Sequence, residues 1–147
     1  LPVEAIEMDY PLLVETYGLV EDSGGPGRHR GGTGLRRVIR PLGHECTFSG
    51  SGERLRNAPW GIFGGGAGRR GRFVRIEADG SLSSLPGKPA AVPFGPDQCV
   101  MIETPGSGGY GDPGDRPAEM LERDRTSGKF TEAFLSGHYA HATPDRG

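Results

Sequence analysis

Two glycine-rich blocks constrain the fold of this 147-residue chain more than any other feature of its sequence. The first block runs from Asp22 to Gly34 and the second from Thr104 to Pro113. Glycine loses the most entropy when it is ordered, and it reaches positive φ without a steric cost. Such blocks are therefore either unfolded linkers or tightly specified loops against which another backbone, a phosphate or a substrate packs. The rest of the chain favours the second interpretation.

Composition is compatible with a folded, loop-rich protein. The chain holds 27 glycines and 13 prolines, a fraction at which low-complexity disorder has to be considered. Disordered chains, however, lack apolar clusters that offset the entropy of ordering. This chain has four such clusters, at residues 10–20, 35–42, 72–85 and 90–104. We therefore expect residues 1–147 to form a single unit with one modest core.

Within that unit, the local patterns predict an α+β fold with mainly antiparallel β-structure, glycine-rich loops and two short C-terminal helices. We expect an acidic lead segment, a β-rich core that contains the glycine blocks, and a helical tail, over residues 1–22, 23–113 and 114–147. Alternating apolar residues predict strands, at residues 33–41, 45–49, 72–78 and 81–85. The Asp79-Gly80 pair predicts a hairpin between the last two of them.

The remaining segments complete this prediction. Residues 92–94 and 98–103 are expected to pair with each other, while 12–20 fit either a short helix or an edge strand. A helical turn is expected at 3–9, since Pro11 excludes its continuation. The two C-terminal helices are expected at 118–127, ended by Gly128, and at 131–139, capped by Thr131. Residues 141–147 are expected to form a polar tail.

Charge is distributed unevenly although the net charge is only −2. Residues 1–22 contain six acids and no base, whereas residues 23–75 contain eleven arginines against Glu45 and Glu53. Arginine forks suit carboxylates and phosphates. This pattern fits an anionic ligand, an acidic neighbouring subunit, or ion pairs between these arginines and acids of the same fold.

The first glycine block has the features of an anion-binding loop, because exposed backbone N–H groups and arginines occur together in it. The residues expected to face an anion or a partner are Gly24, Gly25, Arg28, Arg30, Gly31 and Gly32. The block does not match the phosphate-binding P-loop, which requires Gly-Lys-Ser/Thr before a helix. A structural loop or a subunit contact is the alternative.

Other candidate sites are weak. His138 and His141 are spaced to meet on one helical turn, but no third ligand accompanies them, so we predict no metal site in this chain. Two cysteines, Cys46 and Cys99, are too few to form a zinc site, but they could form one disulfide bond. No catalytic residue can be assigned. Without a signal peptide or an apolar span, we expect a cytoplasmic protein without a membrane contact.

Arginine–glycine segments at Arg28–Gly32 and Arg69–Phe73 raise the possibility of a polyanion-binding module. RNA-binding segments of this kind usually recur many times and alternate with aromatic residues. Here they are single and border strand patterns, which argues against nucleic acid as the partner. A stand-alone arginine/glycine-rich module remains the rival class of function.

Several long motifs follow one another along this chain. The first glycine block is followed by Ala58-Pro59-Trp60-Gly61-Ile62-Phe63-Gly64-Gly65 and then by Thr104-Pro-Gly-Ser-Gly-Gly-Tyr-Gly-Asp-Pro113. A tail pattern then runs through Leu121, Asp124, Gly128, Thr131 and Tyr139. In these motifs and in their order the chain resembles the carboxyl-terminal portion of the hydantoinase B/oxoprolinase family, and the resemblance covers nearly the whole chain.

The resemblance implies a component of an ATP-dependent amidohydrolase that opens cyclic amides such as hydantoin, 5-oxoproline or lactams. Relatives that carboxylate acetone or acetophenone suggest a ketone carboxylase subunit as the alternative. ATP and a divalent metal are then bound outside this chain, which binds no cofactor itself and is not active alone. The implied partners are the remainder of the B subunit and an ATP-binding A-type subunit, in a hetero-oligomer.

In that setting the chain is expected to act as a scaffold and chamber wall. The glycine blocks would form close-packed walls. The residues expected to serve as structural anchors are Pro59, Trp60, Gly61, Phe63, Gly108, Gly109 and Tyr110.

Overall fold

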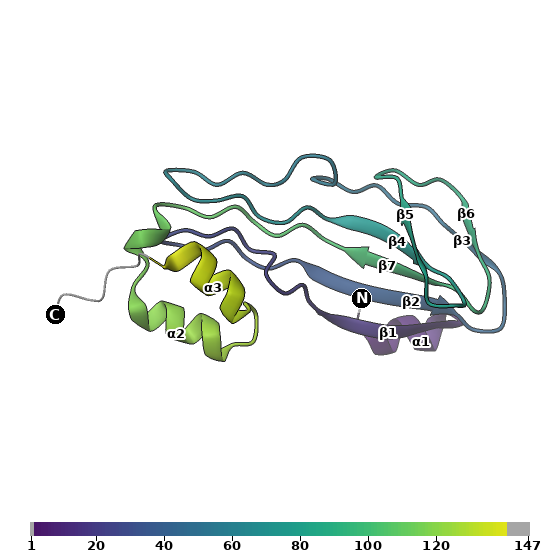
Figure 1. Ribbon diagram of the computed structural model, residues 1–147. Coiled ribbons are helices and arrows are strands. Elements are labelled where there is room, and N and C mark those ends of the chain that lie inside the picture. The colour runs from purple at the N-terminus through teal and green to yellow at the C-terminus, as the bar shows by residue number, and fades with distance from the viewer. Residues whose placement is uncertain (1, 141–147) are drawn as a thin grey trace. The chain divides into compact units, whose positions relative to one another are not determined.

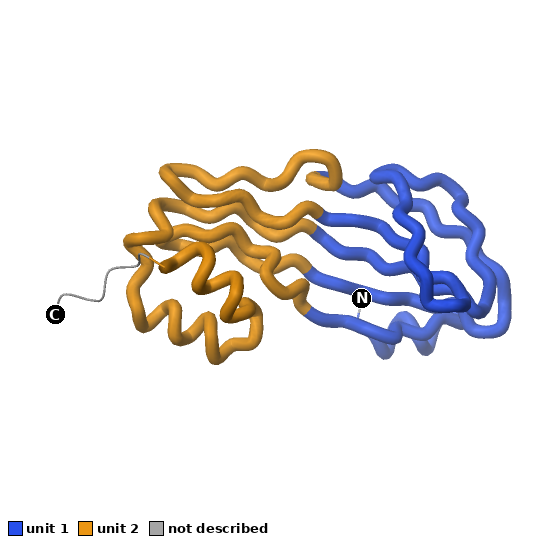
Figure 2. The backbone as a smooth tube through the Cα atoms, in the orientation of Figure 1, with its two compact units in different colours: residues 1–18, 35–53, 71–104 blue, residues 19–34, 54–70, 105–147 orange. Residues whose placement is uncertain are grey.

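The computed structural model describes residues 2–140, in which strands, short helices and long extended segments follow one another (Figure 1). The backbone divides into two compact units, coloured separately in Figure 2. Among the described residues, unit 1 comprises 2–18, 35–53 and 71–104, and unit 2 comprises 19–34, 54–70 and 105–140. Each unit is therefore built from three separate stretches of the chain.

Unit 1 contains a five-stranded sheet with the strand order β1-β2-β7-β4-β5. The strands are β1 (Leu12–Leu19), β2 (Leu35–Pro41), β4 (Arg72–Ile76), β5 (Leu82–Leu85) and β7 (Cys99–Glu103). The central strand β7 pairs antiparallel with both β2 and β4, so that Met101 lies opposite Val38 on one side and Val74 on the other. A separate two-stranded sheet joins β3 (Cys46–Phe48) to β6 (Val92–Phe94), and helix α1 (Val3–Asp9) precedes β1.

Most of the predicted elements of unit 1 are confirmed. The β4–β5 hairpin turns at Asp79-Gly80, where Gly80 has a φ of 81° and the Asp79 carboxylate accepts from the Ser81 amide at 2.9 Å. Of residues 12–20, which fit a helix or a strand, Leu12–Leu19 form the edge strand β1. The predicted pairing of 92–94 with 98–103 is wrong, because β6 pairs with β3 and β7 pairs with β2 and β4.

Apolar side chains from the central strands form the core of unit 1. Val38, Val74, Cys99 and Met101 are buried together, with Ile76 packed against them. Phe48 of β3 meets Phe73 of β4 edge to face, with ring centroids 5.4 Å apart, and it also meets Phe94 of β6. The Phe48–Phe73 contact packs the two-stranded sheet against the five-stranded one, whereas Phe48 and Phe94 pack within the two-stranded sheet.

Unit 2 contains the predicted C-terminal helices. They are α2 (Ala118–Thr126) and α3 (Glu132–Tyr139), preceded by the short 3-10 helix η1 (Pro113–Asp115). Gly128, with a φ of 67°, follows α2, and the Thr131 hydroxyl caps α3 by accepting from the Phe134 amide at 3.1 Å. Phe130, Leu135 and Tyr139 form a small core. The α+β class and both helices are thus confirmed, while the predicted tail 141–147 lies outside the described residues.

Candidate functional site

The glycine-rich stretches of unit 2 pack as extended segments that hydrogen-bond in several directions. The Gly25 amide donates to Ser107 O at 2.8 Å, and the Gly25 carbonyl accepts from the Gly31 amide at 2.9 Å. The next carbonyl, of Pro26, accepts from the Gly66 amide at 2.7 Å. A strand in a sheet bonds only to the neighbours on its two edges. Here two successive residues bond two other segments and a later part of their own segment, and we call residues 23–34, 59–70 and 105–111 the glycine lattice.

Glycine is required in this lattice because neighbouring backbones occupy the space of a side chain. A β-carbon on Gly31 would collide with the Ser107 carbonyl, and one on Gly109 would collide with the Pro26 carbonyl. Gly32, in contrast, has only the Ser107 hydroxyl near it, at 3.8 Å. The tightly packed interpretation of the two glycine blocks is confirmed, and the blocks are not linkers.

The six predicted anion-facing residues lie in three different environments. Gly24, Gly25 and Gly31 are buried in the lattice, where the amides of Gly25 and Gly31 are already bonded to carbonyls. Arg28 and Gly32 are exposed. Anion or partner binding by the predicted set stays a prediction, for which Arg28 offers the accessible charge.

Arg30, the remaining member of that set, faces the protein's own helices. Its guanidinium forms an ion pair with Asp124 of α2 at 2.6 Å and lies over the Phe130 ring. The other oxygen of the same carboxylate accepts from Arg116 at 2.6 Å. Asp124 is 3% exposed and Arg116 is 6% exposed. The sequence alone assigns no role to Asp124, because an acidic residue in a highly charged helix is normally exposed to solvent. The one feature that points to Asp124 is its place in the tail pattern.

Further contacts tie the C-terminal helices to the first glycine block. The Asp22 carboxylate accepts from the Thr131 amide at 2.8 Å and from the Thr131 hydroxyl at 2.7 Å. The Tyr139 hydroxyl lies 3.2 Å from the Gly27 amide, and Arg116 donates to the Arg28 carbonyl at 2.9 Å. The helical tail thus fixes the backbone on which Arg28 is carried.

The predicted structural anchors separate into backbone and side-chain groups. Gly61, Gly108 and Gly109 lie inside the lattice, and the Pro59 carbonyl accepts from the Gly68 amide at 2.8 Å. The aromatic anchors have their rings exposed: Trp60 is 64% exposed, Phe63 76% and Tyr110 47%. Their role as anchors stays a prediction, and within the described residues these rings are not part of a core.

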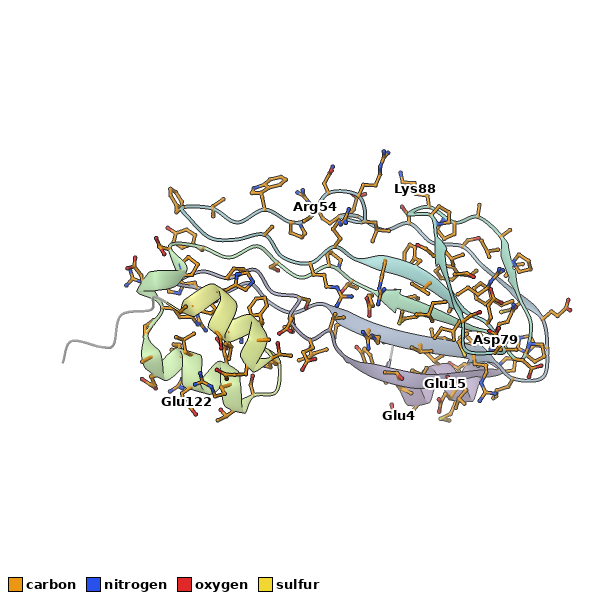
Figure 3. All side chains as sticks on the ribbon, in the orientation of Figure 1. Glu4, Glu15, Arg54, Asp79, Lys88 and Glu122 are labelled. Atoms are coloured by element: carbon orange, nitrogen blue, oxygen red, sulfur yellow. The ribbon has the colours of Figure 1, made fainter. Side chains whose placement is uncertain are left out.

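These rings gather along one margin of unit 2, which we call the aromatic edge and define as Trp60, Ile62, Phe63 and Tyr110. Phe63 meets Tyr110 edge to face at 5.2 Å, and Ile62 and Tyr110 form a backbone bridge. The Arg54 guanidinium, labelled in Figure 3, stacks over Trp60 at 4.1 Å. The segment that carries this edge lies on the opposite side of the glycine segments from α2 and α3 (Figure 2).

Arginines of the basic middle region also form ion pairs in unit 1. The Glu103 carboxylate is 2% exposed and accepts from Arg36 Nε at 2.6 Å and from Arg72 Nε at 2.5 Å. Burial alone would raise the pKa of Glu103, but the hydrogen bonds from Arg72 and Arg36 outweigh it and hold that pKa below its ordinary value. Arg40 pairs with Glu15 at 2.6 Å. Pairing within the fold is therefore confirmed for these arginines and for Arg30.

Unit 1 also carries an open polar pocket of about 720 Å³. Its lining comprises Glu45, Cys46, Thr47, Arg75, Pro93, Phe94, Gly95 and Gln98. Arg75 is held by Glu77 at 2.7 Å, and Gln98 donates to the same carboxylate at 2.6 Å. Hydrogen bonds from Arg75 and then Gln98 hold the pKa of Glu77 below its ordinary value. Because the arginine of this pocket is already neutralised, the pocket offers no uncompensated positive charge to an anionic ligand.

No group of three or more histidine, cysteine, aspartate and glutamate side chains within residues 2–140 is arranged to hold a metal ion. His141, the second member of the predicted histidine pair, lies outside that range. Cys46 and Cys99 are both free thiols. In the same part of the chain, every helix is too short or too polar to cross a membrane.

Known proteins with sequences like this one are much longer than it. The chain is 41% identical over 123 residues to uncharacterized protein MJ0963 of Methanocaldococcus jannaschii, which aligns with 84% of this chain and 21% of that protein. It is 35% identical over 134 residues to caprolactamase subunit beta of Pseudomonas jessenii, covering 86% of this chain and 22% of that subunit. The chain thus spans about a fifth of the length of these relatives.

Two solved structures have folds similar to that of this chain. The ATP-dependent caprolactamase of Pseudomonas jessenii superposes with a TM-score of 0.75 at 26% identity, over 99% of this chain and 25% of the caprolactamase chain. Acetone carboxylase shares the fold, with a TM-score of 0.70 at 19% identity over 94% of this chain and 22% of its own. Residues 1–113 match the Hydantoinase B/oxoprolinase family. The predicted resemblance is confirmed, and the chain belongs to the hydantoinase B/oxoprolinase family.

Proposed function

We propose that this chain is part of an ATP-dependent enzyme that opens cyclic amides of the lactam, hydantoin or 5-oxoproline type. The observation that carries the proposal is its likeness to caprolactamase, which holds in sequence and in structure and extends over both units. Since the chain spans only about a fifth of such relatives, we place it as the carboxyl-terminal part of a B-type subunit.

The proposed role of the chain is to form a rigid wall of the reaction chamber. Close backbone packing in the glycine lattice supports this role, because bonded extended segments without side chains between them leave little freedom to move. The buried ion pairs of Asp124 and Glu103 support it as well, since each carboxylate joins two arginines from separate parts of the chain. Such fixed walls hold reacting groups in place.

In this proposal the ATP and the divalent metal are bound by other parts of the complex, in the cytoplasm. The partners would be the remainder of the B subunit and an ATP-binding A-type subunit. The donor groups of the described residues do not fit a metal centre, so no chemical step is assigned to a metal in this chain. This chain would contribute shape and rigidity, and the transferred groups would react elsewhere.

A test requires the chain in complex with the polypeptides that complete its enzyme. The complex is supplied with ATP and, in separate reactions, with caprolactam, hydantoin and 5-oxoproline. Chromatography with mass spectrometry then measures the ring-opened product and ADP. We expect stoichiometric ring opening and ADP formation with at least one substrate, and none with the chain alone. Turnover by the isolated chain, or an active complex that lacks it, would contradict the scaffold role.

A ketone carboxylase subunit is the second candidate, favoured by the fold shared with acetone carboxylase. The same preparation, given acetone, ATP and labelled bicarbonate, tests it through label incorporation into acid-stable product. A polyanion-binding module is the rival of a different class. It would be favoured if the isolated chain bound polyuridylate with an affinity that falls steeply as salt rises.

A further inference from the structure

We propose that the aromatic edge of unit 2 is a docking site for an extended polypeptide segment that carries carboxylate side chains and belongs to another part of the enzyme complex. This inference rests on the proposed function as a scaffold within a larger assembly. It deepens that function by naming the surface and the chemistry of the partner.

Exposed apolar area is the first observation. Trp60, Ile62, Phe63 and Tyr110 are 64%, 48%, 76% and 47% exposed. Backbone and ring contacts join Ile62, Phe63 and Tyr110, and Trp60 lies two residues before Ile62 on the same segment. Single exposed apolar residues are ordinary, whereas a contiguous aromatic patch marks an interaction surface. Trp and Tyr are also enriched among the residues that dominate binding energy at interfaces.

Unpaired backbone donors are the second observation. The Ile62 amide donates inward to the Gly109 carbonyl at 3.0 Å. The amides of Trp60, Gly61, Phe63 and Gly64 have no acceptor among residues 2–140. Phe63 and Gly64 are the central residues of a tight turn, which the Gly65 amide closes by donating to the Ile62 carbonyl at 3.0 Å. The free N–H groups of this turn and of Trp60 and Gly61 are available to another chain, as are those of an open sheet edge. An added extended segment can supply carbonyls to these donors, as in recognition by strand addition.

The conformation of Phe63 is the third observation. Its φ is 51°, in the left-handed region that bulky residues avoid. The ring of Phe63 is largely exposed, so burial of the ring within this chain does little to offset the energy of the strained backbone. Strained residues of this kind cluster at binding and active sites. Covering by a partner would supply the missing burial.

Charge identifies the partner. Residues 54–70 contain four arginines and no acid. Arg54 is exposed and stacked on Trp60, and exposed Arg28 follows on the neighbouring segment. The acids beside this margin are Glu53, which precedes Arg54 in the sequence, and Asp112, whose carboxylate accepts from the Gly114 amide at 2.7 Å, so arginines outnumber acids here. Charge complementarity therefore selects a segment with carboxylates.

The size of the relatives indicates where such a segment comes from. About four fifths of each sequence relative lies outside the part that this chain matches. Nucleic acid could also stack on exposed rings and meet arginines. The row of free amides beside a lattice of extended backbones favours an extended peptide, which repeats the bonding already present in the lattice.

Photo-crosslinking in the intact enzyme complex tests the proposal. A benzoylphenylalanine probe replaces Phe63, and a control complex carries the same probe at Met120, an exposed residue of α2 that is 39% exposed. We expect the probe at position 63 to crosslink to one segment of another part of the complex, rich in small residues and containing Asp or Glu. The probe at 120 should not crosslink to that segment. A crosslink to RNA, to a second copy of this chain, or to no polypeptide would overturn the proposal.

Hydrogen exchange adds a direct reading of the backbone. In the complex, the amides of residues 60, 61, 63 and 64 should exchange more slowly than in the isolated chain, whereas the Ile62 amide should be protected in both. Unchanged exchange at those four amides would contradict docking. If the complex opens cyclic amides while these amides stay unprotected, the docking inference fails and the proposed function stands. If they are protected in a complex without that activity, the proposed function fails and docking stands.

Substitutions separate docking from folding. Phe63→Asn keeps a residue that tolerates positive φ and removes the ring, while Arg54→Glu reverses the charge. Each should weaken association of the chain with the complex by about tenfold or more and leave the thermal midpoint of the isolated chain unchanged. Met120→Ala is the matched control, with unchanged association. Normal association of both edge variants would refute the proposal.

Discussion

The carboxylate of Asp124 lies 2.6 Å from Arg30 Nε, and this ion pair joins helix α2 to the first glycine block. Arg116 binds the second oxygen of the same carboxylate, so one acid neutralises two arginines in a largely buried place. The helical tail is therefore attached to the glycine lattice through charge as well as through the Tyr139 hydroxyl.

Replacing Asp124 by Asn should destabilise the protein by about 3–5 kcal/mol, because two arginines would keep their charge without a counter-ion in a buried site. Urea unfolding followed by circular dichroism measures the loss. Glu119→Gln is the matched control, since Glu119 pairs with Arg123 on the exposed face of the same helix. That change should cost about 0.5 kcal/mol or less. Equal effects of the two substitutions would show that burial of the Asp124 pair adds nothing.

Replacing Gly31 by Ala should prevent the lattice from closing, at a cost of about 3 kcal/mol or more, because the new methyl group would collide with the Ser107 carbonyl. The neighbouring Gly32→Ala serves as control, with room for a methyl group and a small gain of about 0.4–1 kcal/mol from a stiffer unfolded chain. Thermal unfolding of both variants gives the comparison. A Gly31→Ala protein as stable as the parent would disprove the close approach.

Stability should fall in acid through Glu103. Its folded pKa lies below the ordinary value of 4.5, so the stability that it contributes is complete above pH 4.5 and is lost as the pH falls through the folded value. Urea midpoints measured between pH 7 and pH 3 should show this decline. In Glu103→Gln the protein should be less stable near neutral pH, and its decline in acid should be shallower. A parallel decline in both proteins would assign the acid sensitivity to other groups.

Alkylation should distinguish the two thiols. Burial, followed by the nearby Glu15 carboxylate, raises the pKa of Cys99 to about 11. At pH 8, on the order of one Cys99 thiol in a thousand is therefore ionised. Iodoacetamide should modify half-buried Cys46 first in the folded protein and both thiols in urea, as followed by peptide mass spectrometry. Equal rates in the folded protein would contradict the shielding of Cys99.

Local chemistry explains the parts of the fold that could be predicted from sequence. The Asp79-Gly80 turn, the Thr131 cap and the glycine after α2 depend on neighbouring residues alone, and each lies where its pattern indicates. The pairing of β6 could not be read in this way. Its partner β3 is distant in the sequence, and short apolar strands carry no signal of which edge they join.

The glycine lattice could be predicted as tightly packed, but its register could not. Segments without side chains have no hydrophobic period, so nothing in the sequence indicates that Pro26 bonds Gly66 or that Gly25 bonds Ser107. The aromatic anchors were predicted from a motif, which names residues and does not reveal that Trp60 and Phe63 are exposed in this chain. Asp124 escaped assignment because burial of a charge depends on partners far along the chain.

Because the glycine lattice is held together by hydrogen bonds between peptide groups, its unfolding should have a distinctive effect on the heat capacity. Heat capacity rises on unfolding mainly because apolar surface becomes hydrated, whereas exposure of polar surface lowers it. Apart from the rings of Pro26 and Pro105, residues 23–27 and 105–109 release peptide groups and little hydrocarbon when they come apart. Melting of the lattice should therefore add unusually little to the heat-capacity step of this protein, and the free energy of this region should vary with temperature along a nearly straight line.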